Sequence, residues 1–186
     1  NRGLSENRRG VQPGDHGKRC RIRGMQSSAE RILAKGLKSG YAGKGERLTV
    51  HRGPFALTAE ELAFPELDAQ YNDHWIAKRV GGGQEIAQAG DELATRVFAG
   101  GIVHPDKLSP LGITESDVLS FLKTTLSELA ETTRLYKNIT RSDGYWQYTY
   151  EVIKTFPEVP LMVGIESICY KGKPVFVHAF LNAPVV

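Results

Sequence analysis

The clearest pattern of hydrophobic and polar positions lies between residues 108 and 183, where a helical period gives way to a strand period. Apolar residues between Val118 and Leu129 recur at spacings of three and four, so they share one stripe of a helix. Thr114 and Asp117 have the spacing of a capping box, which satisfies two free backbone donors at a helix start. We therefore expect a long helix from about Thr114 to near Lys137, with one buried face.

Beyond a polar turn at 141–144 the period changes to two. Trp146, Tyr148 and Tyr150 fall on one face of an extended segment, with polar residues on the other. We expect strands at 146–156, 161–170 and 175–181. The last two form a hairpin across a short turn, in which Gly172 adopts a positive φ. The aromatic face is interpreted as core packing rather than as a platform for stacking bases.

The upstream part of the chain has weaker patterns. Residues 47–51 read as a short strand, and 58–61 as the capped start of a short helix that stops at Pro65. Residues 75–80 and 93–99 are further strand candidates, and Gly81–Gly83 is interpreted as a flexible loop. The resulting fold class is α+β, a mostly antiparallel sheet covered by the long helix.

Charge is divided unevenly along the chain. The net charge of +3 combines 13 basic and 4 acidic residues in 1–52 with 11 basic and 17 acidic residues in 53–186. We therefore expect a basic, glycine-rich N-terminal arm at 1–45, ordered only against a partner, and one domain at 46–186. The residues predicted to bind that partner are Arg8, Arg9, Lys18, Arg19, Arg21 and Arg23.

Catalytic and metal-binding patterns are weak. His74, His104 and Lys107 could together form an acid–base site acting on RNA. Arg52 at a strand end is similar to the phosphate-gripping arginine of mono-ADP-ribosyltransferases, but the downstream Glu-x-Glu or Gln-x-Glu motif of those enzymes is missing. No close ligand pattern predicts a metal, and no motif predicts a cofactor. Cys169 is expected to be a buried thiol, without a disulfide framework.

Several motifs in order resemble the PsbP-like extrinsic proteins of photosynthetic membranes. They are the strand within Leu93–His104, the helix start Leu111-Gly112-Ile113-Thr114-Glu115-Ser116-Asp117-Val118, the strand start Asp143-Gly144-Tyr145-Trp146-Gln147-Tyr148-Thr149-Tyr150-Glu151, and a hairpin turning at Lys171-Gly172-Lys173. The resemblance covers about half of the chain. It lacks the family's closing helix and its Gly-Phe-x-Phe opening strand, and the basic arm has no counterpart in it.

The resemblance implies an α/β/α sandwich in the chloroplast thylakoid lumen, without catalysis, metal or cofactor. The leading hypothesis is therefore a non-catalytic extrinsic subunit or assembly factor that docks on a photosystem, peripheral to the membrane, through its arm and domain surface. Nucleic acid is a less favoured partner because the body is acidic. Two alternatives stay open: a small toxin-like enzyme acting on RNA or NAD, and an arm-bearing component of another large assembly such as a ribosome.

Overall fold

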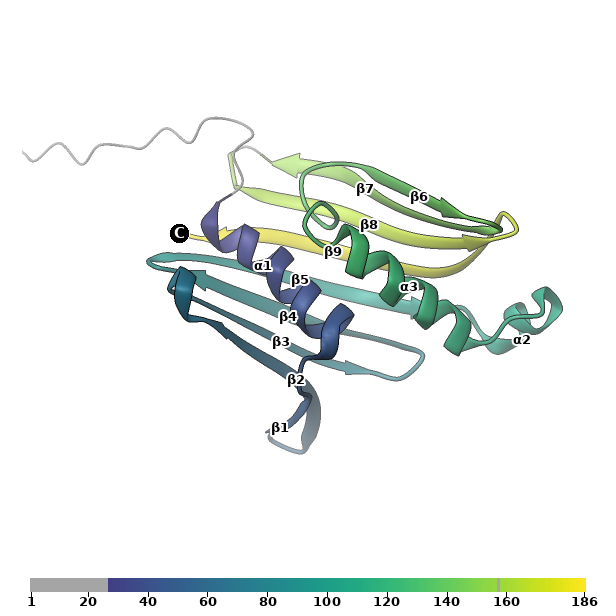
Figure 1. The fold of residues 1–186 in the computed structure, drawn as a ribbon, viewed down its shortest axis with the longest axis horizontal. Helices are drawn as coiled ribbons and strands as arrows, with labels where there is room; N and C mark the ends of the chain where they lie inside the picture. The colour runs from purple at the N-terminus through teal and green to yellow at the C-terminus, as the bar shows by residue number, and fades with distance from the viewer. Residues whose placement is uncertain (1–26, 157) are drawn as a thin grey trace, which may run out of the picture.

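A computed structural model describes residues 27–156 and 158–186. Within them, nine antiparallel strands form a single sheet in the order β1-β2-β3-β4-β5-β9-β8-β7-β6 (Figure 1). The strands are β1 (Leu48–Arg52), β2 (Phe55–Phe64), β3 (Ala69–Ala77), β4 (Val80–Ala89), β5 (Glu92–Ile102), β6 (Ile139–Asp143), β7 (Trp146–Phe156), β8 (Leu161–Tyr170) and β9 (Lys173–Val185).

The sheet consists of two meanders that meet at its centre. Strands β1 to β5 pair in chain order, strands β6 to β9 do the same, and β9 pairs antiparallel with β5. The helix α1 (Ser28–Ser39) precedes the first meander, and α3 (Glu115–Leu129) precedes the second. Each half of the chain is thus a helix followed by a meander. The short helix α2 (Pro105–Leu108) lies in the connection between the halves.

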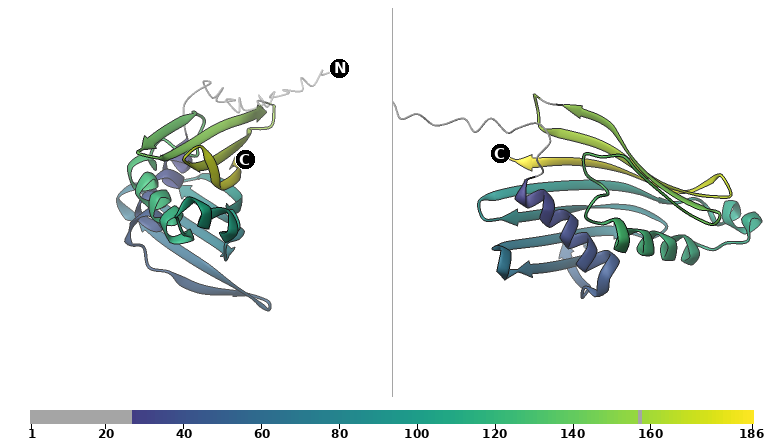
Figure 2. Two further views of the ribbon diagram at one scale, coloured as in Figure 1. Left: turned by 90° about the vertical axis from the view of Figure 1, so that its right-hand side faces the viewer. Right: turned by 45° about the horizontal axis from the view of Figure 1, so that its top comes forward.

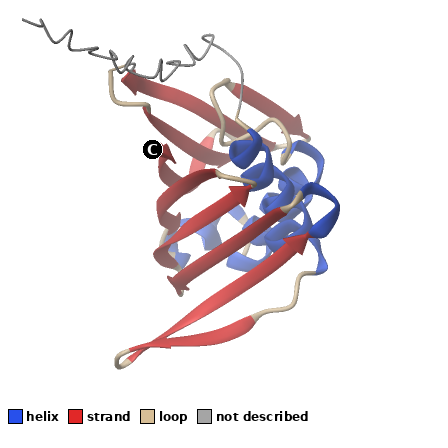
Figure 3. Cartoon of the chain, turned by 90° about the vertical axis from the view of Figure 1, so that its left-hand side faces the viewer, coloured by secondary structure: helices blue, strands red, loops and turns tan. Residues whose placement is uncertain are grey.

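Both main helices begin at capping boxes. Ser27 accepts the backbone N–H of Glu30, whose carboxylate accepts the N–H of Ser27 in return, and Thr114 and Asp117 make the same exchange at α3. The helices lie over one face of the twisted sheet, as Figures 2 and 3 show from other directions. The apolar core therefore lies between the helices and that face, with Tyr71 and Phe180 among its fully buried side chains.

The opposite face of the sheet has no helix over it among the described residues. Four aliphatic side chains on its central strands, Val97, Ile165, Val177 and Leu181, have exposed fractions between 37% and 46%. The α+β class and the antiparallel sheet are confirmed. The predicted α/β/α sandwich needs helices on both faces, and the described part of the chain supplies them on one.

The predicted strand 146–156 and the hairpin after it are confirmed as β7, β8 and β9. Gly172 has the positive φ expected of the hairpin turn, at 71°. The first strand of that hairpin, β8, spans 161–170 as predicted. The helix α3 is shorter than expected: it ends at Leu129, and a series of turns and bends follows where the prediction continued to Lys137. Cys169 lies in its predicted strand but is only partly buried.

Two upstream predictions are wrong. Residues 58–61 belong to strand β2, because pairing with both β1 and β3 satisfies backbone groups that the local capping pattern would otherwise satisfy. Gly81–Gly83 is also strand, within β4, and not a flexible loop. The candidate strand 75–80 spans the end of β3, the turn at Lys78 and Arg79, and the first residue of β4.

The expected arm also extends too far into the chain. Helix α1 packs on β3, β4 and β5, and Ala29, Leu33 and Leu37 are at most 2% exposed. The basic and glycine residues on either side of α1 indicated an arm, whereas the buried apolar face of this twelve-residue helix makes it part of the core. Residues 27–45 therefore belong to the folded domain, and the rest of the predicted arm lies outside the described residues.

Replacing Leu33 by alanine tests whether α1 is part of the core. The substitution should lower the free energy of unfolding by about 2–4 kcal/mol, because it removes buried methyl groups and leaves a cavity. Urea unfolding followed by circular dichroism measures the change. Exposed Arg31 on the same helix is the matched control, and Arg31→Ala should shift stability by no more than about 0.5 kcal/mol. An equally small effect of Leu33→Ala would place α1 outside the core.

Candidate functional site

A row of buried polar side chains crosses the covered face of the sheet. Glu60 is paired in register with Asp73, Asp73 with Glu85, Glu85 with Arg96, and Arg96 with Asn182, so five adjacent strands contribute one residue each. All five residues are at most 5% exposed. Buried polar groups destabilise a fold unless they are paired, so the partners of this row decide what the interior can do.

The two halves of the chain repeat one arrangement of these groups. The first half contains Gly83, Glu85, Arg96 and Phe98, and the second contains Gly164, Glu166, His178 and Phe180. In each half the glutamate is paired in register with the basic residue. In each half a buried tyrosine from the preceding strand, Tyr71 or Tyr148, donates its hydroxyl to that glutamate at 2.7 Å. The meanders are therefore related in chemistry as well as in topology.

In the first half the repeat forms a complete ion pair. Arg96 Nη2 donates to Glu85 Oε1 at 2.6 Å, and Arg96 Nε donates to the other carboxylate oxygen. Burial acts to raise the pKa of Glu85, but the charge of Arg96 and its hydrogen bonds outweigh burial, so the pKa is lowered and the carboxylate stays ionised.

In the second half the cation that pairs with the glutamate does not come from the neighbouring strand. Arg134, from the segment after α3, donates to the two oxygens of Glu166 at 3.0 and 2.8 Å. His178, which stands where the first half has Arg96, has its Nδ1 3.7 Å from Glu166 Oε2, too far for a hydrogen bond. That nitrogen is buried without a hydrogen-bond partner among the described residues. Burial lowers the pKa of His178 to about 4, so its imidazole is neutral at physiological pH.

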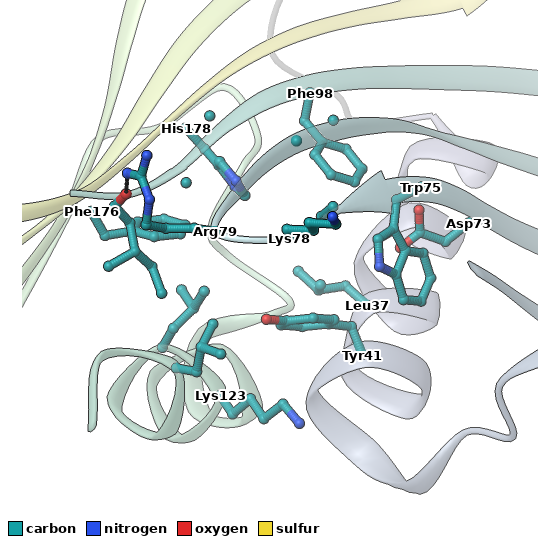
Figure 4. A pocket seen from close by; sticks show the side chains of 18 of the residues that line it. Leu37, Tyr41, Asp73, Trp75, Lys78, Arg79, Phe98, Lys123, Phe176 and His178 are labelled. Atoms are coloured by element: carbon teal, nitrogen blue, oxygen red, sulfur yellow. Dashed lines mark hydrogen bonds between the residues drawn. The ribbon is translucent and has the colours of Figure 1, made fainter. Parts of the chain in front are cut away.

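His178 faces a cavity of about 240 Å³ between the helices and the centre of the sheet (Figure 4). Its walls come from the end of α1 and the following π-helical segment η1 (Gly40–Lys44), from α3, and from strands β3, β4, β5 and β9. Aromatic side chains dominate the lining: Tyr41, Trp75, Phe98 and Phe176. The volume is slightly below the range of about 300–1,000 Å³ that is typical of small-molecule sites.

Asp73 lies on the other side of this cavity from His178 (Figure 4). It is 4% exposed, and its Oδ1 has no hydrogen-bond partner among the described residues. Burial, with the nearby charge of Glu85, raises the pKa of Asp73 to about 8. The side chain is therefore mostly a neutral carboxylic acid at pH 7, able both to donate and to accept a hydrogen bond.

Two glycines make room for the cavity walls. A Cβ atom at position 83 would lie 2.7 Å from the Cβ of Trp75 and 2.8 Å from the ring of Phe98. At position 100, where φ is 146°, it would lie 2.7 Å from the ring of His178. The glycines of β4 and β5 thus allow the aromatic and imidazole rings to occupy this region.

Positive charge surrounds the cavity. Five cationic side chains line it, and two of them are paired: Arg47 with Glu60, and Arg134 with Glu166. Among the described residues, no carboxylate lies within salt-bridge distance of the other three, which are Lys78, Arg79 and Lys123. Arg79 donates to the carbonyl of Ile102 at 2.6 Å, while both lysines are exposed.

The residues singled out from the sequence do not form this site. Arg8, Arg9, Lys18, Arg19, Arg21 and Arg23 all lie outside the described residues. His104 caps α2 beside Asp106, and its carbonyl accepts the backbone N–H of Lys107 at 2.8 Å. His74 instead contacts Arg52 and Glu61, so it does not join the other two residues of the predicted ribonuclease site. Arg52 is exposed at the end of β1, next to the turn into β2. Within the described residues, no group of three His, Cys, Asp or Glu side chains is placed to hold a metal.

The site residues were missed because buried charges do not follow hydrophobic periodicity. The signal that could have found them is the internal repeat, a glycine two residues before a glutamate and a basic residue two before a phenylalanine, in both halves.

None of the described helices is long and apolar enough to cross a membrane. In comparisons with known proteins, no family model, curated protein or solved structure matches this chain.

Replacing Asp73 by asparagine should flatten the dependence of stability on pH. The folded-state pKa of about 8 is above the ordinary value of 3.8, so between these pH values the folded protein binds more protons than the unfolded chain. Stability contributed by the neutral carboxyl is present below pH 4 and is lost as the pH rises towards 8. Asparagine resembles the neutral acid, so at pH 9 the variant should be more stable than the wild type by at least about 1 kcal/mol.

Urea unfolding at pH 5 and pH 9 measures this difference. Asp91→Asn, at an exposed turn between β4 and β5, is the matched control and should keep the pH dependence of the wild type. An unchanged pH dependence in Asp73→Asn would contradict the neutral state of this carboxyl.

Proposed function

We propose that this protein is a non-catalytic binding protein that holds a small molecule in the cavity between α1, α3 and the sheet. The observation that carries the proposal is that Asp73 and His178 line opposite sides of one cavity, and that the buried Oδ1 and Nδ1 atoms of these residues find no hydrogen-bond partner in the described part of the chain. Less than 1 Å² of either atom is accessible, so small rotations of the two side chains would let a ligand with polar ends and an apolar middle pair with both.

The aromatic lining supports a flat ligand. Tyr41 and Trp75 pack edge to face, with ring centroids 6.5 Å apart, and Phe98 contacts the ring of His178 at 5.7 Å. These rings present apolar faces to the cavity, between its two polar sides. Binding rather than catalysis is favoured because an imidazole with a pKa of about 4 is a weak base at neutral pH, and no hydrogen bond joins His178 to Asp73 as a nucleophile and its base would be joined.

Tryptophan fluorescence can test the cavity directly. The chain has two tryptophans: Trp75 lines the cavity, and Trp146 stacks on Phe121 at 4.9 Å. In a Trp146→Phe protein, emission therefore reports on Trp75 alone. We expect single-ring compounds that carry a hydroxyl group and a second polar group to change this emission saturably.

A second substitution shows whether the change arises in the cavity. Ala77 is exposed and lines the cavity, so Ala77→Phe should block it and weaken binding at least tenfold. Ala56→Phe, at an exposed position of β2 away from the lining, should bind as the parent protein does. If no such compound changes the emission, or if Ala77→Phe binds equally well, the cavity is not a binding site.

We also propose a second function, in which the protein is an extrinsic subunit or assembly factor of a photosystem. It would dock on this membrane protein complex through the basic segment, which is the part of the basic N-terminal arm that precedes α1. The support is the excess of basic residues in 1–52 over an acidic remainder, together with the motif resemblance. The same proposal includes the fold expected of that family, an α/β/α sandwich with helices on both faces of the sheet.

Deleting residues 1–26 tests this second function without disturbing the helix, because α1 and its cap at Ser27 remain. The truncated protein should melt within a few degrees of the full chain but bind thylakoid membranes more weakly, with less dependence on salt. Deleting residues 1–44 is the contrasting variant and should destabilise the domain, since it removes α1. Equal, salt-independent binding by the full chain and the first truncation would exclude the basic segment as the docking element.

A further inference from the structure

We propose that the ligand of this cavity is a small aromatic anion, one ring with an acidic group, whose ring lies against Trp75 and Tyr41 and whose charge is held by the exposed lysines of the lining, Lys78 and Lys123. This inference rests on the proposed binding function and adds the chemical class of the ligand.

The charge of the lining determines the sign of the ligand. The cations Lys78, Arg79 and Lys123 have no carboxylate partner among the described residues, and Asp73 is the one carboxyl group in the lining. Because Asp73 is mostly protonated at neutral pH, it does not offset them. The cavity is therefore a region of positive potential bounded by apolar walls, which concentrates anions.

The placement of the groups determines which end of the ligand is charged. Lys78 and Lys123 are exposed, so an acidic group beside them keeps part of its hydration. Asp73 and His178 are neutral and their free atoms are fully buried, so they suit an uncharged hydroxyl or amide. A charge at the buried end would have to shed its water, while of the arginines in the lining Arg134 is paired with Glu166 and Arg79 donates to the carbonyl of Ile102.

The size of the cavity limits the ligand to about one ring. Its 240 Å³ equals the liquid volume of roughly eight water molecules, enough for a benzene ring with two short substituents. The Lys123 Nζ lies 5.7 Å from the centroid of the Tyr41 ring, so the cation and an aromatic wall are adjacent. An acidic group on the ligand ring can therefore reach the lysine while the ring contacts Tyr41.

Calorimetric titration of the full chain with four probes tests the charge. The probes are 4-hydroxybenzoate, its neutral analogue 4-hydroxybenzamide, phenyl phosphate, and inorganic phosphate. We expect one or both aromatic anions to bind at least about fivefold more tightly than the amide, with affinity falling as salt is raised. Tighter binding of the benzoate assigns the anion as a carboxylate, and tighter binding of phenyl phosphate assigns it as a phosphate ester.

Lysine substitutions test the position of the charge. The double variant Lys78→Gln, Lys123→Gln should weaken binding of the aromatic anion about fivefold and leave binding of the amide unchanged, since each exposed ion pair contributes modestly. Lys173→Gln, an exposed lysine of β9 that does not line the cavity, should change neither.

Each outcome separates the two proposals. If the amide binds as tightly as the anions, or the double variant binds the anions normally, the anionic class is wrong while the binding function stands. Binding of inorganic phosphate as tight as that of the aromatic anions would show that the ring adds nothing, which also overturns the inference. If none of the four probes binds and no neutral ring compound changes Trp75 emission, both proposals fail together.

Discussion

The interaction on which this structure depends is the one that Arg134 makes with both halves of the chain. Its guanidinium binds Glu166 in the second meander, while its backbone carbonyl accepts hydrogen bonds from Arg96 at 3.3 Å and from Asn182 at 2.9 Å. The residue adopts a φ of 57°, uncommon outside glycine, and its guanidinium lies 4.7 Å from the ring centroid of Phe180. Four buried charges are thereby balanced in one connected network beneath the helices, which leaves little freedom in how the meanders join.

The cavity lies where the repeat of the two halves is broken. In the first half the glutamate takes its cation from the neighbouring strand, so Arg96 is occupied. In the second half the cation comes from the segment after α3, and the neighbouring strand carries His178, which is smaller and uncharged. The space beside His178 and its unpaired nitrogen have the same origin, because Arg134 pairs with Glu166 in place of a cation on the neighbouring strand. The proposed binding site thus lies where one ion-pair partner of the repeat is replaced by a residue from another segment.

How much of this could be predicted depends on whether a residue's neighbours are close in the sequence. The hairpin of β8 and β9 and the cap of α3 follow from local patterns at Gly172, Thr114 and Asp117, and these predictions are confirmed. Residues 58–61 carry an equally good local capping pattern, yet pairing on both sides makes them strand. Glu85 and Asp73 look like ordinary surface carboxylates in the sequence, because their burial depends on α1, which the basic composition around it assigned to an arm instead of to the folded domain. The cavity could not be predicted, since its walls come from segments more than one hundred residues apart, such as those that carry Tyr41 and His178.

The pairing of β5 with β9 has a consequence for how the chain acquires its fold. These strands are neighbours at the centre of the sheet, but α2, α3 and three other strands lie between them in the chain. During synthesis, β5 therefore presents an open hydrogen-bonding edge until β9 has emerged, and contacts between positions so distant in the chain form slowly. An incomplete chain therefore presents an unpaired strand edge, which favours pairing with other chains.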